Sequence, residues 1–280
     1  MRIVITGAAR GIGGSLARRL GERGDQVALI GLEPELMAEV AARLPHATCY
    51  EGDVTNRSGY ERVVERAAKK LGGIDVVVAN AGVAAQLPLV GGNPDTFDRM
   101  IAVNIRGVYD TIRTAGPYLM ESGGYALLIS SLGAAVHLPL MGGYSASKAA
   151  VEALGNALRG EFAPSGARVG IAYFAELETD MTRRGFGTNA ARQAFGGRAV
   201  SGVAPLAPAI DALVRGIDGR RRVIVSPWWV RPLLPTRAIA QRVLELALGS
   251  RVAEAVAIAR REDAPLTTEL PCPSAIESPA

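Results

Sequence analysis

The sequence predicts an α/β protein built on one doubly wound parallel sheet with helices on both faces. Short apolar runs alternate with longer segments of helical period along most of its 280 residues, a pattern typical of parallel strands joined by right-handed helical crossovers. Two runs, 75–79 and 125–130, are almost continuously apolar, as strands covered on both faces are. A glycine-rich turn at 7–13 follows the first run, where sheets of this Rossmann type bind their ligands.

The expected elements follow one another in a regular order. The apolar runs predict strands at residues 3–6, 26–31, 48–51, 75–79, 125–130, 168–173 and 223–225. Apolar residues at helical spacing predict helices at residues 11–23, 35–44, 60–71, 97–120 and 146–162, and a further helix before the last strand. The stretch 174–208, rich in glycine, arginine and alanine, is expected to form a mobile lid or substrate loop.

The domain organisation follows from length and composition. We expect residues 1–225 to form a single domain, because α/β domains often reach this length without dividing. Residues 226–263 are expected to form a helical extension, with one amphipathic helix from about Thr236 to Arg261, packed on the domain or on a partner subunit. Its Trp and Leu content with interspersed Arg leaves peripheral contact with a membrane surface as an alternative. Residues 264–280, rich in Pro, Ser and Thr, are expected to be a disordered tail.

Composition and charge exclude several classes of function. The formal charge of +4 arises from 31 basic and 27 acidic residues that are scattered along the chain, so no nucleic-acid partner is expected. The cysteines, Cys49 and Cys272, lack metal-ligand or redox spacing, which predicts neither a metal site nor a disulfide. The N-terminus goes directly into an apolar strand, and no apolar run reaches the roughly 18 residues of a membrane span. We therefore expect a cytoplasmic protein.

The glycine-rich turn predicts a dinucleotide site. It reads Thr6-Gly7-Ala8-Ala9-Arg10-Gly11-Ile12-Gly13 and opens the first helix. Glycines there let the backbone approach a pyrophosphate, whose charge meets the free N–H groups and positive dipole end of the helix. Asp53-Val54 follows the third expected strand, and Asn80-Ala81-Gly82 follows the fourth. Because these positions meet at one edge of the sheet, the domain 1–225 is expected to bind a dinucleotide there.

These motifs, in this order, resemble those of the short-chain dehydrogenase/reductase family. The resemblance covers roughly residues 1–225 and implies an NAD or NADP cofactor, with Asp53-Val54 near the adenine ring and Asn80-Ala81-Gly82 supporting the sheet beside it. The residues expected to contact the cofactor are Gly7, Arg10, Gly11, Ile12, Gly13, Gly31, Leu32, Asp53, Val54, Asn80, Ala81, Gly82, Tyr144, Lys148 and Thr179.

The end of the second expected strand bears on the choice between NAD and NADP. Gly31 stands where relatives that prefer NAD usually carry an aspartate, so a repulsion against the 2′-phosphate of NADP is absent. Arg10 adds attraction for that phosphate, Glu33 opposes it, and Leu32 supplies no basic group. The balance favours NADP slightly, and both cofactors stay open.

A tyrosine and a lysine four residues apart form the centre of the expected catalytic site. Tyr144 and Lys148 open a strongly helical segment and fall on one helix face. A nearby cation is expected to lower the pKa of the phenol and make it a usable acid and base. By the family resemblance, Ser131 polarises the substrate oxygen, Asn104 holds a water-mediated proton path to the lysine, and Lys148 also binds the nicotinamide ribose.

One departure from the family pattern concerns the segment after the sixth expected strand. The family usually has Pro-Gly there, whereas this chain reads Phe174-Ala175-Glu176-Leu177-Glu178-Thr179. Thr179 still matches the residue that contacts the nicotinamide carboxamide. An apolar substrate pocket is expected from Leu138, Pro139, Leu140, Met141, Phe186 and Phe195, with His137 in their midst expected as a solvated loop residue rather than a substrate contact.

The resulting prediction is an oxidoreductase that moves a hydride between the cofactor and an alcohol or carbonyl carbon of a small, hydrophobic substrate. A cofactor-binding sensor without chemistry, and an epimerase or dehydratase on a related fold, are the alternatives. The retained Tyr144, Lys148 and Ser131 argue against the sensor, and the short chain and Asn104 argue against the epimerase. A homodimer or homotetramer is expected through the helices 97–120 and 146–162, whose small residues Ala149, Ala153 and Ala157 permit close helix contact.

Overall fold

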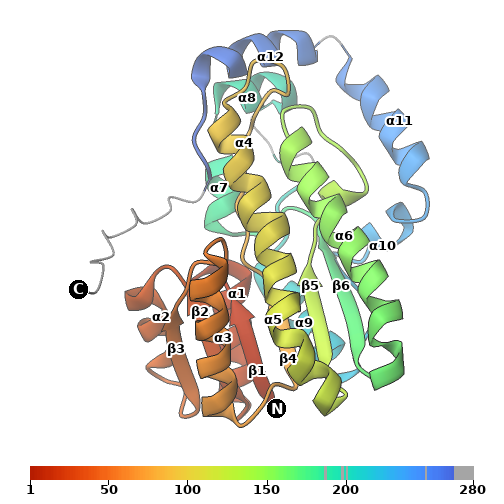
Figure 1. The fold of residues 1–280 in the computed structure, drawn as a ribbon. Helices are drawn as coiled ribbons and strands as arrows, with labels where there is room; N and C mark the ends of the chain where they lie inside the picture. Colours follow the sequence, from red (N-terminus) through yellow and green to blue (C-terminus); the bar gives the residue numbers. More distant parts are fainter. Residues whose placement is uncertain (186–187, 197–198, 200, 250, 268–280) are drawn as a thin grey trace.

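The computed structural model confirms a doubly wound α/β fold (Figure 1). It describes residues 1–185, 188–196, 199, 201–249 and 251–267. One seven-stranded sheet has the order β3-β2-β1-β4-β5-β6-β7, and every neighbouring pair is parallel. The strands are β1 (Arg2–Thr6), β2 (Gln26–Gly31), β3 (Ala47–Glu51), β4 (Val76–Ala79), β5 (Tyr125–Ile129), β6 (Arg168–Phe174) and β7 (Val223–Ser226).

The connecting helices lie close to the predicted positions. The helices between the strands, and those after the last strand, are α1 (Gly11–Glu22), α2 (Pro34–Ala41), α3 (Arg57–Leu71), α4 (Pro94–Ile101), α5 (Gly107–Ser122), α6 (Gly142–Phe162), α7 (Asp180–Gly185), α8 (Asn189–Phe195), α9 (Leu206–Asp218), α10 (Val230–Leu233), α11 (Arg237–Leu248) and α12 (Arg251–Glu262). Short 3₁₀ turns follow β5 at Leu132–Ala134 and α6 at Ala163–Ser165.

Two hydrophobic cores form because successive strand residues point to opposite faces of the sheet. On one face, Val4 and Ile30 pack with residues of α3, α5 and α6, which lie side by side in Figure 1. On the other face, Ile3, Ile5 and Leu29 pack with residues of α1, α2 and α9. The strand order reverses between β1 and β4, so a crevice is expected beyond the carboxyl ends of these strands.

The helix expected at 97–120 is interrupted. It begins earlier, at Pro94, where the side chain of Asn93 accepts hydrogen bonds from the backbone N–H groups of Asp95 and Thr96. Between α4 and α5, residues Ala102–Arg106 form one turn of π-helix. A π turn inserts an extra residue into the helix and frequently marks a functional site.

The stretch 174–208, expected as a mobile lid or substrate loop, is partly helical and contains α7, α8 and the start of α9. Its role as a lid stays a prediction, whereas one expectation about the C-terminal helices is wrong. The single helix expected from about Thr236 to Arg261 is two helices, since Gly249 ends α11 with φ of 49°, a left-handed backbone that breaks the helix. No described residue of α11 is buried, and Ile239, Val243 and Leu246 are exposed.

The segment after β7 reaches back over the domain. α12 packs on α8 (Figure 1), and the Glu262 carboxylate accepts hydrogen bonds from the backbone N–H groups of Asn189 and Ala190. Thr267, within the segment expected as a tail, is buried and donates two hydrogen bonds to the carbonyl of Ala84. The remainder of that tail, with Cys272, lies outside the described residues. The domain boundaries at 225 and 263 stay a prediction.

The described part of the chain contains no helix long and apolar enough to cross a membrane. Among the same residues, no group of three or more His, Cys, Asp or Glu side chains could hold a metal ion. Cys49 is a free thiol and is exposed.

Candidate active site

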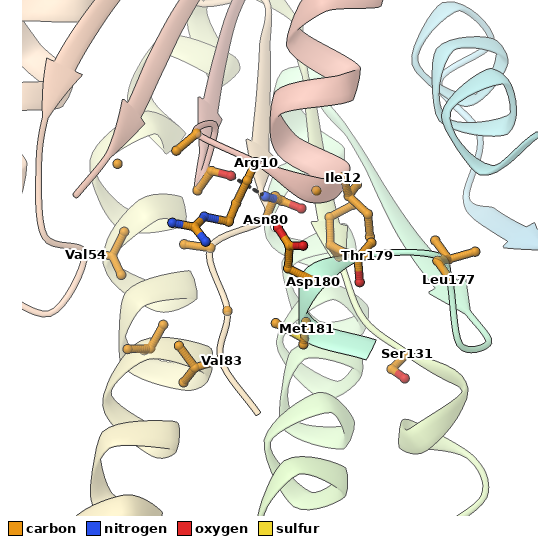
Figure 2. Close-up of a pocket in the computed structure, with 18 of the residues that line it drawn as sticks. Arg10, Ile12, Val54, Asn80, Val83, Ser131, Leu177, Thr179, Asp180 and Met181 are labelled. Carbon is orange, nitrogen blue, oxygen red and sulfur yellow. Dashed lines mark hydrogen bonds between the residues drawn. The ribbon is translucent and has the colours of Figure 1, made fainter. Parts of the chain in front are cut away.

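Two adjoining pockets lie at the carboxyl ends of the strands. The larger, which we call the cleft, is lined by residues at or just after the ends of β1 to β6. It brings together nearly all of the predicted site residues: Gly7, Arg10, Gly11, Ile12, Gly31, Leu32, Asp53, Val54, Asn80, Ala81, Gly82, Ser131, Tyr144, Lys148 and Thr179. Figure 2 shows this pocket, with Arg10 and Val54 toward one end and Ser131 toward the other. Gly13 and Asn104 do not line it.

The glycine-rich turn fits an anionic group. Gly7 and Gly11 have φ of 61° and 54°, which few other residues adopt. A Cβ on Gly13 would lie 2.2 Å from the carbonyl oxygen of Gly7, so this glycine packs the turn against α1. α1 has no side-chain cap and no acidic residue in its first turn. Its N–H groups and positive dipole end are therefore available to a pyrophosphate at the cleft.

A hydrogen-bond network joins the ends of β1 and β4 beneath this turn. The hydroxyl of Thr6 accepts from the backbone N–H groups of Asn80 and Ala81, each at 3.0 Å. The Asn80 amide donates to the carbonyls of Thr6 and Gly7 at 2.9 and 3.1 Å, and Figure 2 shows Asn80 next to the turn. The motif at 80–82 thus holds the two central strands together, as the resemblance implies.

The far end of the cleft carries an ion pair. Arg10 Nε donates to Glu33 Oε2 at 3.0 Å, and a second guanidinium nitrogen contacts the other carboxylate oxygen. Asp53 accepts hydrogen bonds from the backbone N–H and the hydroxyl of Thr55, both at 2.8 Å. Gly31 and Leu32 line this end without a charged group. Arg10, which is expected to attract the 2′-phosphate of NADP, is thus paired with Glu33, which is expected to repel it.

Tyr144 and Ser131 lie where the cleft meets the second pocket, because both residues line both cavities. Ser131 begins the 3₁₀ turn after β5, where its hydroxyl accepts from the backbone N–H of Gly133 at 3.0 Å. The same hydroxyl donates to the carbonyl of Phe174 at 3.5 Å. A substrate oxygen placed there would meet two hydroxyl groups from different elements.

The pKa of Tyr144 moves opposite to the prediction. Burial raises it above its ordinary value; the hydrogen bond with Ser131 opposes this rise, and the charge of Glu176 adds to it. Lys148 Nζ is 5.7 Å from the centre of the Tyr144 ring and donates to the carbonyl of Ile129 at 3.0 Å. Burial lowers the pKa of Lys148 to about 8. The expected lowering of the phenol pKa is therefore wrong for the protein alone, because loss of solvation on burial is the largest influence on this pKa.

Asn104 lines neither pocket and instead holds neighbouring segments of the site in position. It lies in the π turn, fully buried, where its Oδ1 accepts from the Val83 N–H at 2.8 Å. Its Nδ2 donates to the Val83 carbonyl at 2.8 Å and to Ser147 Oγ at 2.9 Å. These bonds tie the loop after β4 to α6. A Cβ on Gly82 would lie 3.4 Å from both Asn104 Oδ1 and Lys148 Nζ, so the glycine keeps this corner open.

The segment that lacks Pro-Gly forms a short bridge instead of a tight turn. Leu177 pairs with Ala204, the N–H of Ala204 donates to Glu176, and the N–H of Glu178 donates to Ala204. Thr179 still lines the cleft, and its hydroxyl lies 3.2 Å from that of Thr182. The altered sequence therefore keeps Thr179 in place and turns Glu176 toward the second pocket, which it lines.

The second pocket, which we call the side pocket, is largely apolar. Its apolar side chains come from several segments: Leu132, Val136, Leu138, Met141, Phe174, Met181 and Leu244. Leu138 and Met141 were predicted for it. Leu140 and Phe195 were also predicted but belong to the apolar cluster where α8 packs on α12, and Pro139 does not line the pocket. Phe186 lies outside the described residues. His137 is exposed, as expected.

Sequence reasoning missed several polar residues of the side pocket, among them Gln86 and Glu176. It also missed Ser130, whose hydroxyl donates to the Lys148 carbonyl at 2.9 Å and holds α6 against β5. The departure from Pro-Gly was a signal for Glu176. Gln86 follows the strand-end motif by four residues and carries no local signal, because its surroundings come from distant parts of the chain.

Comparison with known proteins identifies the family. The sequence profile of the family described as short chain dehydrogenase matches residues 1–189. A short-chain dehydrogenase/reductase (eriH) of Hericium erinaceus is 36% identical over 173 residues, which are 58% of this chain and 69% of that protein. The glucose 1-dehydrogenase of Gluconobacter oxydans is 35% identical over 175 residues, 60% of this chain and 66% of its own length.

Solved structures agree with this result. A short chain dehydrogenase from Burkholderia cenocepacia in complex with NADP superposes with a TM-score of 0.74 at 26% identity, covering 89% of this chain and 97% of that one. An alcohol dehydrogenase from the archaeon Thermococcus sibiricus, complexed with 5-hydroxy-NADP, gives a TM-score of 0.61 at 30% identity over 64% of this chain and 78% of its own. The chain belongs to the short chain dehydrogenase family. It is an NAD(P)-dependent oxidoreductase of the class that acts on CH–OH and C=O groups.

Proposed function

We propose that this protein interconverts a ketone and a secondary alcohol on an apolar small molecule, with Tyr144 as the acid and base and NADP as the preferred cofactor. One observation carries the proposal: Tyr144 and Ser131 both line the cleft and the apolar side pocket, so their hydroxyl-bearing side chains lie where the two cavities meet. The cleft fits a dinucleotide in its glycine turn, and the side pocket fits an apolar substrate.

The residues that would hold the cofactor are those of the cleft. The α1 N-terminus and Gly11 face its pyrophosphate, Asp53 and Val54 the adenine, and Lys148 and Thr179 the nicotinamide end. The bound nicotinamide supplies or accepts the hydride. Gly31 carries no carboxylate to repel a 2′-phosphate, and Arg10 offers a guanidinium to attract one. The two similar structures that contain NADP or its 5-hydroxy form add support for NADP over NAD.

Side chains of the protein transfer the proton that the reaction requires. In reduction, Tyr144 donates its phenolic proton to the substrate oxygen, and Ser131 donates a hydrogen bond to the negative charge that develops on that oxygen. In oxidation, the Tyr144 phenolate takes the proton of the alcohol. Lys148, whose pKa is lowered by burial to about 8, keeps a cation near the phenolate at neutral pH. Asn104 positions this group by holding the loop after β4 against α6.

The oligomeric state and the cellular location are further parts of the proposal. We propose a homo-oligomer in which α5 and α6 pair with a second copy, since Ala153 and Ala157 on α6 and Tyr109 on α5 are exposed. Small side chains on that face permit close approach of two helices. A cytoplasmic location stays a prediction.

The test is a fluorescence titration with NADPH and NADH in parallel, followed by a screen of apolar ketones with the nucleotide that binds. We expect both nucleotides to bind, NADPH more tightly, and at least one apolar ketone to be reduced. Binding of neither nucleotide would sink the proposal. Binding without turnover of any ketone would point to the cofactor-binding sensor instead.

A further inference from the structure

Gln86 is a buried polar residue that the proposed reaction does not use. It lies on the loop after β4, it is 4% exposed, and it lines the side pocket together with Tyr144 and Ser131. Its Nε2 has no hydrogen-bond partner among the residues that the structure describes. No other residue of the side pocket has such an unpaired buried side-chain atom in the described part of the chain.

The loop that carries Gln86 is fixed on both sides. The N–H of Leu87, the next residue, donates to the carbonyl of Leu140 at 2.6 Å. The carbonyl of Ala84 accepts from the backbone N–H and the hydroxyl of Thr267 at 2.8 and 3.0 Å. Val83 and Ala85 are buried in the core. The backbone of this loop therefore gives Gln86 little freedom to turn toward solvent.

The orientation of the Gln86 amide is also fixed. Thr188 begins α8, and its hydroxyl accepts from the backbone N–H of Ala191 at 3.0 Å. The same hydroxyl donates its one proton to Oε1 of Gln86. Because Oε1 is used in this way, Nε2 is the atom left to bind something else.

A buried donor without a partner is unfavourable, and such groups are retained mostly where a ligand satisfies them. The surrounding wall is apolar: Leu132, Leu138, Met141 and Leu244 line the same pocket. A ligand that fills this pocket therefore meets the hydroxyl groups of Tyr144 and Ser131 at one point and the Gln86 amide donor at another. Most of the remaining wall is hydrocarbon, with Glu176 and a few hydroxyl-bearing side chains among the lining residues.

We propose that Gln86 Nε2 binds a second oxygen of the substrate. The inference rests on the proposed function and narrows its substrate class to apolar ketones and alcohols that carry, apart from the reacting oxygen, an acceptor oxygen such as a carbonyl. Simple monofunctional ketones leave the Gln86 donor unpaired in the complex. Sites built to hydrogen-bond a substrate group reject analogues that lack it.

The test compares monoketones with diketones of the same length. Purified full-length protein is assayed with NADPH on decan-2-one and on decanediones whose second carbonyl is at carbon 5, 6, 7 or 8. The second carbonyl of one of these diketones is expected to reach Gln86 and to raise kcat/KM about tenfold or more over decan-2-one. Because either carbonyl can be reduced, decan-3-one, decan-4-one and decan-5-one, which carry the second carbonyl alone, are assayed as well. The statistical factor of each diketone is the summed kcat/KM of its two matching monoketones divided by that of decan-2-one, and only a rise above this factor counts.

Two variants and a control assign the preference to Gln86. Gln86→Met keeps the length of the side chain without the donor, and the diketone-to-monoketone ratio of kcat/KM is expected to fall to the statistical factor. Gln86→Glu places acceptors there, and the ratio is expected to fall below one. Gln26→Met makes the same exchange at an exposed position at the start of β2, the opposite end of the strand from the cleft, and should keep the wild-type ratio. Thermal melts and NADPH titrations confirm that each variant is folded.

The outcomes separate this inference from the proposed function. Reduction of decan-2-one and of every diketone at equal kcat/KM would overturn the role of Gln86 while the proposed function stands. A preference that survives in Gln86→Met would overturn it as well. Failure of the wild type to reduce any of these ketones, although it binds NADPH, would count against the proposed function itself and remove the basis of the inference.

Discussion

The cleft and the side pocket differ in how the chain builds them. The cleft is made largely of backbone and small residues at strand ends, with Thr6 and Asn80 joining its two central strands. The side pocket is made of side chains from segments far apart in the sequence, including Leu244 and Thr267 near the C-terminus. The difference indicates that the cofactor end is set by the fold, whereas the substrate end is set by residues that can change without disturbing the sheet.

The largest expected effect is at the junction of the two pockets. Tyr144→Phe removes the proton donor and is expected to lower kcat by about 10³-fold, within the range of general acid–base catalysis. NADPH binding should persist, since the phenyl ring remains. Steady-state kinetics on a reduced ketone and a parallel NADPH titration make the measurement. Tyr109→Phe, at an exposed tyrosine of α5, is the matched control. Retention of activity in Tyr144→Phe would show that another residue is the proton donor.

The next effect tests whether backbone packing holds the cleft together. Gly13→Ala would put a Cβ 2.2 Å from the Gly7 carbonyl, and the forced shift is expected to lower the free energy of unfolding by about 3 kcal/mol and to weaken NADPH binding. Urea denaturation measures the change. Gly160→Ala on α6 has nothing within 4 Å of the added Cβ, so it should leave stability unchanged or slightly increased. Equal stability of both variants would contradict the packing account.

A smaller effect concerns the choice of nucleotide. Glu33→Gln frees Arg10 from its ion pair and removes a negative charge near the ribose end of the cleft. The Kd for NADPH is expected to fall about fivefold, in keeping with a partly exposed ion pair, while the Kd for NADH changes less. Glu35→Gln, at an exposed position in the first turn of α2, is the control. A similar change for both nucleotides would show that Arg10 does not face the 2′-phosphate.

The smallest effect is a shift in pH dependence at the side pocket. The charge of Glu176 contributes to the raised pKa of Tyr144, so Glu176→Gln should lower that pKa. Alcohol oxidation needs the phenolate, which forms as pH rises through the pKa of Tyr144. The acid limb of kcat/KM for oxidation should therefore move to lower pH in the variant and stay in place in Glu178→Gln, at an exposed position. A shift to higher pH in Glu176→Gln would reverse the sign of this interaction.

The difference between the cleft and the side pocket also explains which features of the site could be predicted from the sequence. Strand positions and the glycine turn follow from local patterns, namely apolar runs and residues that need a positive φ, so the sheet and the cleft residues were predicted closely. The opposite influences of Arg10 and Glu33 on a bound 2′-phosphate were expected, but the ion pair that joins the two side chains was not. Gly13 and Asn104 were placed in the correct region, but their contacts with Gly7 and Val83 depend on packing that no local pattern shows.

The rest of the site depends on long-range contacts. The loop that carries Gln86 is held by hydrogen bonds to the distant Leu140 and Thr267, and the raised pKa of Tyr144 has burial as its largest cause. The break at Gly249 was also missed, because a single glycine within a helical pattern is often tolerated. The packing of distant segments determines which side chains are buried, and burial in turn shifts their pKa values. A single sequence does not show this packing.

The most direct test of hydride transfer with Tyr144 as the acid uses NADPH carrying two deuterium atoms at C4 of the nicotinamide. The alcohol formed from a reduced ketone is analysed by mass spectrometry. The account predicts one deuterium on the carbinol carbon of the wild-type product, and a product formed about 10³-fold more slowly by Tyr144→Phe. An alcohol without deuterium, or equal rates from both proteins, would contradict it.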